Sequence, residues 1–110
     1  MKEKTFYLWL DDMRPCPYKN DETTQCKLAH SVNKAIKYLL TAEKQGYENF
    51  ILDLDHDLGD FAFDGGDGIE FVKWLVETGR TTKKYKVMIH TMNIVGKVNM
   101  LALIDRYWEE

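Results

Sequence analysis

The chain has 110 residues, of which 45% are hydrophobic and 30% charged, and its formal net charge is -3 at pH 7. This length and composition predict one globular domain spanning residues 1–110. The mild charge and the scattered basic residues exclude a duplex DNA-binding surface, whereas a single nucleotide or an RNA end needs only a few local donors. No apolar stretch approaches the roughly 20 residues that span a bilayer, so we expect a cytoplasmic protein with no membrane partner.

The first predicted element is a buried strand. Thr5 to Leu10 (TFYLWL) is a continuous apolar run that stops at Asp11 and Asp12, as expected of a strand covered on both faces. Asp12 to Thr24 contains both prolines and no periodicity, which indicates a loop. Cys26 to His30 predicts a short second strand.

The two cysteines, Cys16 and Cys26, are too far apart for a CxxC unit. Two cysteines alone form neither a disulfide framework nor a zinc ligand set, so we expect two reduced thiols. A domain of this length buries enough apolar surface to fold without such cross-links. A short sheet still leaves edge strands that a partner can cover, and the sequence therefore leaves homodimerisation open.

Three segments with apolar residues at helical spacing predict helices. The first begins after Ser31, a candidate N-cap, and ends before Gly46. The second runs from Gly68 to about Thr78, with Asp67 as N-cap and a glutamate three residues later, as in a capping box. The third runs from about Val95 to Trp108.

Two further buried strands are predicted at Phe50 to Leu54 (FILDL) and at Val87 to Ile89. Strands that alternate with helices favour right-handed crossovers in a short, mostly parallel sheet. The carboxyl ends of such strands share one edge of the sheet, which is where ligands bind in open α/β folds. The polar residues that follow the predicted strands are Asp11, Asp12, Asp55, His56, Asp57, His90, Thr91 and Asn93.

The carboxylates at this edge predict a metal site. Like charges a few ångströms apart need a counter-charge, and a divalent cation is the natural candidate. Carboxylate oxygens suit Mg²⁺ or Mn²⁺, while neighbouring imidazoles shift the preference toward Mn²⁺ or Zn²⁺. We therefore expect a cation at Asp11, Asp12 and Asp55. The alternative is that these residues are caps or solvated strand ends, which explains any one of them but not carboxylates after two separate strands.

The basic residues at the same edge suggest phosphoester chemistry. Arg14 either neutralises the acid pair or offers a planar fork to phosphate oxygens. An imidazole titrates near neutral pH, so His56 and His90 are candidates for a general base and a general acid. A single histidine is more often structural, but two at neighbouring strand ends favour the catalytic interpretation. Asp57 and Asn93 would orient the histidines or the substrate.

The segment from Gly59 to Gly68 (GDFAFDGGDG) is glycine-rich and acidic. Gly68 is a candidate to present its backbone N–H to a phosphate at a helix N-terminus, although Asp67 competes for the same donors. Phe61 and Phe63 are candidates for stacking on a base, but loop aromatics more commonly pack back onto their own domain.

Four motifs together resemble the cyclic-phosphate-processing receiver-like family, a divergent relative of response-regulator receivers: LWLDDMRPCP, LDLDHDLG, GGDGIEFVKWL and IHTMNIVGKVNML. The resemblance covers nearly the full chain and implies a flavodoxin-like, three-layer αβα fold with an acidic pocket. The chain departs from the family pattern at Asp53, an extra acid within a strand, and at Ile94, where relatives often carry proline. Gly68 matches the glycine that opens a helix in the family. The positions that match the family's polar residues are Asp11, Asp12, Arg14, Asp55, His56, Asp57, His90, Thr91 and Asn93.

The resemblance implies processing of cyclic or terminal phosphates of nucleotides or RNA, and we expect a metal-assisted phosphoesterase or cyclic phosphodiesterase. The main alternative is a non-catalytic module that binds a nucleotide or a protein at the same edge. A receiver phosphorylated at Asp55 is disfavoured, because only one predicted helix follows Thr91 and no strand and lysine remain after it. The expected catalytic residues are His56, His90, Asp55, Asp57, Asn93 and Thr91, with phosphate bound by Arg14 and Gly68.

Overall fold

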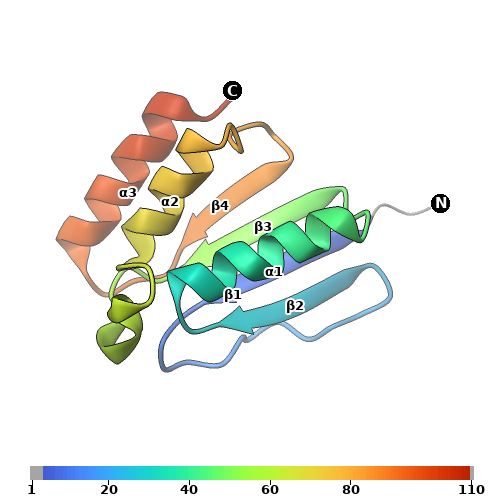
Figure 1. Cartoon of the computed structure of the whole chain (residues 1–110), viewed down its shortest axis with the longest axis horizontal. Coiled ribbons are helices and arrows are strands. Elements are labelled where there is room, and N and C mark those ends of the chain that lie inside the picture. Colours follow the sequence, from blue (N-terminus) through green and yellow to red (C-terminus); the bar gives the residue numbers. More distant parts are fainter. Residues whose placement is uncertain (1–3, 110) are drawn as a thin grey trace.

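A computed structural model describes residues 4–109 and contains a four-stranded, all-parallel sheet of order β2-β1-β3-β4 (Figure 1). The α/β class and the flavodoxin-like parallel sheet are thereby confirmed. The strands are β1 (Thr5–Leu10), β2 (Thr24–Ala29), β3 (Asn49–Leu54) and β4 (Tyr85–Ile89). The helices are α1 (Val32–Lys44), α2 (Gly68–Glu77) and α3 (Ile94–Tyr107), and a short 3₁₀ helix, η1, spans Gly59–Phe63.

The three helices pack on one face of the sheet, where they share a single hydrophobic core. Successive side chains of a strand point to opposite faces, and the core takes alternate positions such as Leu8 of β1 and Leu52 of β3. Each helix contributes to the same cluster, through Leu39 of α1, Phe71 of α2 and Met100 of α3. Helices α2 and α3 lie side by side (Figure 1).

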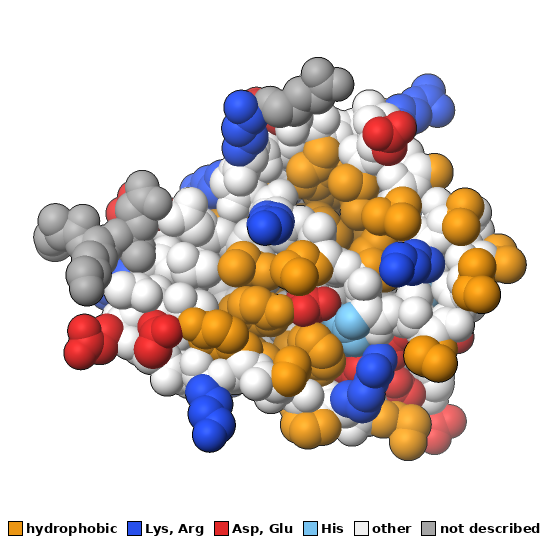
Figure 2. Space-filling view, turned by 180° about the vertical axis from the view of Figure 1, so that it is seen from behind, with side chains coloured by type: hydrophobic (Ala, Val, Ile, Leu, Met, Phe, Trp, Pro, Cys, Tyr) orange, Lys and Arg blue, Asp and Glu red, His pale blue; other side chains and the backbone are white. Residues whose placement is uncertain are grey.

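The opposite face of the sheet carries no helix among residues 4–109, so the expected three layers are reduced to two. Both helical crossovers, from β2 to β3 and from β3 to β4, step in the same direction across the sheet. Right-handed connections that step in one direction place their helices on one side. The connection from β1 to β2 contains no helix, and Figure 2 shows the apolar side chains that remain exposed on this face, which we call the open face; Met88 is 42% exposed there.

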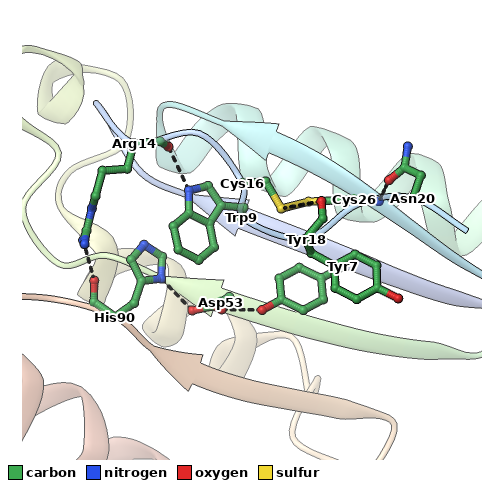
Figure 3. The surroundings of a disulfide bond; sticks show 9 residues. All are labelled: Tyr7, Trp9, Arg14, Cys16, Tyr18, Asn20, Cys26, Asp53 and His90. Atoms are coloured by element: carbon green, nitrogen blue, oxygen red, sulfur yellow. Dashed lines mark hydrogen bonds and ion pairs between the residues drawn. A yellow bond between two sulfur atoms is a disulfide. The ribbon is translucent and has the colours of Figure 1, made fainter.

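The cysteines are joined in a disulfide between Cys16 and Cys26, so the prediction of two reduced thiols is wrong (Figure 3). The segment of residues 11–23 runs back beside β2, which brings together two cysteines ten residues apart in the sequence. Tyr18 of this segment stacks on Tyr7 of β1, with ring centroids 5.3 Å apart. The spacing of the cysteines does not predict this disulfide, because the pairing depends on how the segment of residues 11–23 packs against the sheet.

The start of β4 is tied to α1 by a half-buried charged cluster. Arg80 donates through Nε and a terminal nitrogen to the two carboxylate oxygens of Glu43, at 2.9 and 2.8 Å. The hydroxyl of Tyr85 donates to the same carboxylate at 2.5 Å. The hydrogen bonds from Arg80, with that from Tyr85, outweigh the effect of burial and hold the pKa of Glu43 below its ordinary value.

We expect Glu43→Gln to lower the free energy of unfolding by about 2 kcal/mol at pH 7, because it removes a charge-assisted pair and leaves Arg80 partly unpaired. The folded-state pKa of Glu43 is depressed, so its stabilisation is present above the ordinary value of 4.5 and is lost as pH falls below it. Urea unfolding at pH 7 and pH 3 should show that the difference in free energy of unfolding between the wild type and Glu43→Gln is smaller at pH 3. Glu70→Gln, in an exposed pair with Lys73, is the control. A difference independent of pH would contradict this account.

Candidate functional site

A pocket of about 470 Å³ opens at the carboxyl edge of the sheet. Its walls come from the segments that follow β1, β3 and β4, which the parallel topology brings together. The edge predicted from the sequence is therefore the place where the carboxylates meet. The lining residues are Asp11, Asp12, Met13, Arg14, Asp55, Asp57, Gly59, Thr91 and Met92.

Asp11, at the end of β1, is buried and has every acceptor position of its carboxylate in use. Oδ1 accepts the backbone N–H groups of Met13 and Arg14, at 2.9 and 2.8 Å. Oδ2 accepts Nε of Arg14 at 3.1 Å and lies 3.0 Å from Nε2 of His90. Burial acts to raise the pKa of Asp11, but the two backbone donors, with help from His90 and Arg14, place it below the ordinary value. A carboxylate offers about four lone-pair sites, so Asp11 can bind a cation only by giving up one of these bonds.

Among the described residues, Asp12, Asp55 and Asp57 are the pocket carboxylates that retain free acceptor positions, and Asp57 has one of its two oxygens engaged by His56 and Asn93. Burial raises the pKa of Asp55, and the nearby charge of Asp11 raises it further, against hydrogen bonds from Thr91 and the His56 backbone. Asp12 faces Gly59, where a Cβ would lie only 2.7 Å from its Oδ2. Ligand atoms of Asp11, Asp55 and His90 lie within 4.8 Å of one another. Since the ionised form of Asp55 is disfavoured, a cation at this point would offset its charge.

His56 forms a fixed pair with Asp57 beside the pocket. Its Nδ1 lies 2.7 Å from Oδ1 of Asp57, and Nδ2 of Asn93 donates to that same oxygen at 3.0 Å. The hydrogen bond from His56, followed by that from Asn93, lowers the pKa of Asp57. The imidazole packs on Gly96 of α3, where a Cβ would lie 2.5 Å from the ring. Nε2 makes no hydrogen bond within residues 4–109, so the nitrogen available for proton transfer is defined.

Both ring nitrogens of His90 are occupied, and the bond to Asp53 is drawn in Figure 3. Like His56, His90 is not among the residues that line the pocket. Nδ1 lies 2.5 Å from Oδ1 of Asp53, and Nε2 lies 3.0 Å from Oδ2 of Asp11. The ring stacks on the indole of Trp9, with centroids 3.7 Å apart and planes 1° from parallel. Neither nitrogen is free to exchange a proton with a substrate, so the geometry opposes the predicted role of His90 as a general acid or base.

The model of the cyclic-phosphate processing receiver domain matches residues 6–106 of the chain. The chain belongs to this family. The match runs from β1 to α3 and contains every site residue predicted from the sequence. No curated protein and no solved structure matches the chain. Within residues 4–109 of this receiver domain, no helix has the length and apolar character needed to cross a membrane.

Sequence reasoning set Asp53 aside, yet this receiver domain buries its carboxylate beside the site. Asp53 is only 5% exposed and accepts a hydrogen bond from the Tyr7 hydroxyl at 2.5 Å, in addition to its contact with His90. The signal was present in the strand FILDL: one acid among apolar residues, at a position that alternation places on the face opposite Leu52 and Leu54.

Gly68 is required for packing, which corrects its predicted role in binding phosphate. Its N–H donates to the carbonyl of His56 at 2.7 Å, and a Cβ at this position would lie 1.9 Å from the carbonyl oxygen of Asp55. The side chain of Asp67 accepts the N–H of Leu58 at 3.0 Å and does not cap α2, so the predicted capping box is not formed. The helix N-terminus therefore serves to bring α2 against the end of β3.

The two loop aromatics of η1 behave differently. Phe61 stacks on His30, with ring centroids 5.1 Å apart, as the alternative interpretation expects. His30 also lies 3.1 Å from the carbonyl of Asp11 through Nδ1, which gives this ring a structural role. Phe63 is 86% exposed and remains a candidate for stacking on a ligand.

We expect Gly68→Ala to destabilise the receiver domain by about 1–3 kcal/mol or more, because the added methyl group overlaps the Asp55 backbone and must displace α2 or the end of β3. Urea unfolding measures the loss, with Lys73→Ala on the exposed side of α2 as the control. A Gly68→Ala protein as stable as the wild type would show that α2 does not approach β3 as closely as described.

Proposed function

We propose that this receiver domain hydrolyses a cyclic phosphate of a nucleotide or of an RNA end, with the help of a divalent cation. The observation that carries the proposal is the grouping of Arg14 with Asp12 and Asp55 in one pocket, beside the His56 and Asp57 pair. The family's description supplies the class of substrate. The residues supply carboxylates for a cation and a guanidinium for an anion in one pocket. The proton acceptor, His56, is joined to the pocket through Asp57, which lines it.

The donor set fits a hard cation. Asp55 would hold it, with Asp12 from the wall of the same pocket. Asp11 and His90, whose ligand atoms lie within 4.8 Å of each other and of Asp55, would join only by releasing present hydrogen bonds. Oxygen donors favour Mg²⁺ or Mn²⁺, and the preference for Zn²⁺ weakens because the imidazole of His90 is already engaged. When bound, the cation supplies a Lewis acid for the phosphoryl oxygens.

Arg14 is placed to bind the phosphate. Its Nε donates to Asp11, and a terminal nitrogen donates to the carbonyl of His90 at 3.0 Å, which holds the guanidinium in one orientation. The side chain is still 53% exposed and lines the pocket, so its remaining N–H groups are available to phosphate oxygens. A guanidinium held in this way loses little conformational entropy on binding an anion.

The proton steps fall to His56. Asp57 accepts from Nδ1, so Nε2 is the basic nitrogen of the neutral ring. Nε2 takes a proton from the attacking water while the oxygen of that water forms a bond to phosphorus. The bond from phosphorus to one ribose oxygen breaks, and the imidazolium returns the proton to that oxygen. Asp57 and Asn93 keep the ring in position throughout.

We expect His56→Ala to lower the rate of hydrolysis by a factor on the order of 10² to 10⁴, the usual contribution of a general acid–base group. The measurement is turnover of 2′,3′- and 3′,5′-cyclic nucleotides and of a cyclic-phosphate-ended RNA, with Mg²⁺, Mn²⁺ or Zn²⁺. His30→Ala is the matched control, since that ring lies outside the proposed machinery. An unchanged rate in His56→Ala refutes its role. Silence of the wild type across the panel, with ligand binding intact, favours the non-catalytic binding module.

We expect Asp55→Asn to weaken Mn²⁺ binding at least ~10-fold, because it removes one of two anionic ligands and affinity follows ligand charge. Electron paramagnetic resonance of free Mn²⁺ reports the affinity without any substrate. Asp60→Asn, in the exposed η1 segment, is the control. Equal Mn²⁺ affinity in Asp55→Asn and the wild type would remove the cation from the proposal.

A further inference from the structure

The buried carboxylate of Asp53 is costly for stability. It is 5% exposed in the middle of the sheet, between apolar residues of β3. A buried ionised group costs several kcal/mol before its partners are counted, and a well-packed apolar residue in its place is often neutral or stabilising. Packing alone therefore does not explain an acid at this position. Its partner His90 contacts Asp11, which lines the pocket.

The contacts of Asp53 lead across the sheet in one chain, whose first link, from Asp53 to His90, is drawn in Figure 3. Its Oδ1 meets Nδ1 of His90 at 2.5 Å, and Nε2 of His90 meets Oδ2 of Asp11 at 3.0 Å. The same Asp11 oxygen accepts Nε of Arg14 at 3.1 Å. Each link joins a different strand end, from β3 to β4, from β4 to β1 and from β1 to the segment that follows it.

His90 also contacts Arg14 directly. Its carbonyl accepts a terminal nitrogen of the guanidinium at 3.0 Å, and its ring stacks on Trp9, whose indole N–H donates to the Arg14 carbonyl at 2.9 Å. Two of the groups that hold Arg14 also contact the imidazole of His90: Asp11 Oδ2, which accepts Nε of the guanidinium, and the indole of Trp9, which holds the Arg14 carbonyl. If that ring turns, the Asp11 oxygen that orients the guanidinium loses one of its partners.

We propose that Asp53 is a positioning residue for Arg14, acting through the orientation of His90. Its carboxylate fixes Nδ1 of His90, which aims Nε2 at Asp11 and leaves the guanidinium with its free N–H groups toward the pocket. The inference rests on the proposed function for the anion that Arg14 binds. It assigns to Asp53 the control of the pocket's affinity for phosphate.

The test compares Asp53→Ala, Asp53→Asn and Tyr7→Phe with the wild type. Asp53→Ala removes the acceptor for Nδ1. Asp53→Asn returns an acceptor of nearly the same shape. Tyr7→Phe removes the other hydrogen bond to Asp53 and leaves the contact with His90 intact. Two quantities are measured by NMR: the dissociation constant for inorganic phosphate, and the hydrogen-exchange rate of the Arg14 Nε–H. Urea unfolding of each variant confirms that it is folded.

We expect Asp53→Ala to weaken phosphate binding about 10–100-fold, as loss of a supporting hydrogen bond does in other sites, and to speed exchange of the Arg14 Nε–H. Asp53→Asn should recover most of the affinity. Tyr7→Phe should lose stability and leave both quantities as in the wild type.

Two outcomes overturn the inference. One is an Asp53→Ala protein with wild-type phosphate affinity and wild-type exchange at Arg14. The other is a Tyr7→Phe protein with the same losses as Asp53→Ala, which would assign both residues to packing. If the wild type binds no phosphate while Asp53→Ala still frees the Arg14 Nε–H, the positioning role stands and the proposed function fails.

Discussion

The site is organised around one buried carboxylate, that of Asp11 at the end of β1. Two backbone N–H groups and the Nε of Arg14 donate to it, and the imidazole of His90 completes the set. These bonds turn the chain sharply after a central strand and join it to the end of β4. Because desolvation of a carboxylate is costly, four partners at one point make the geometry of the turn rigid. The direction of Arg14 follows from that turn.

Because the acceptor positions of Asp11 are occupied, other polar groups of the site are the ones with free positions. Asp12 and Asp55 keep open acceptor positions in the pocket, and the pKa of Asp55 is raised by burial and by its charged neighbour. His56 has one nitrogen fixed by Asp57 and one without a partner among the described residues. His90 has neither. Two histidines that look equivalent after two strands therefore differ in how their ring nitrogens are engaged, and for this reason the proton steps are proposed for His56.

The one-sided fold connects this site to the open face of the sheet. With all three helices on one face, Tyr7 and Trp9 of the other face contact the segment of residues 11–23 and not a helix. That segment is joined to β2 by the disulfide, and it contains Arg14. Side chains of the open face thus form hydrogen bonds with residues next to the pocket, Asp53 with His90 and Trp9 with Arg14. A helix layer on this face would place apolar side chains there.

The sequence by itself determined the elements and the edge at which they converge. Apolar runs that stop at carboxylates mark strand ends, and parallel strands share those ends, so Asp11, Asp55 and Asp57 were placed in one pocket without coordinates. Only the tertiary structure decided which way each side chain turns and what it meets. The ring of His90 turns to Asp53 and Trp9, the amide of Gly68 is used by His56, and Cys16 meets Cys26. Each of these contacts joins residues whose proximity depends on how the layers pack, and periodicity along one chain contains no information about that packing.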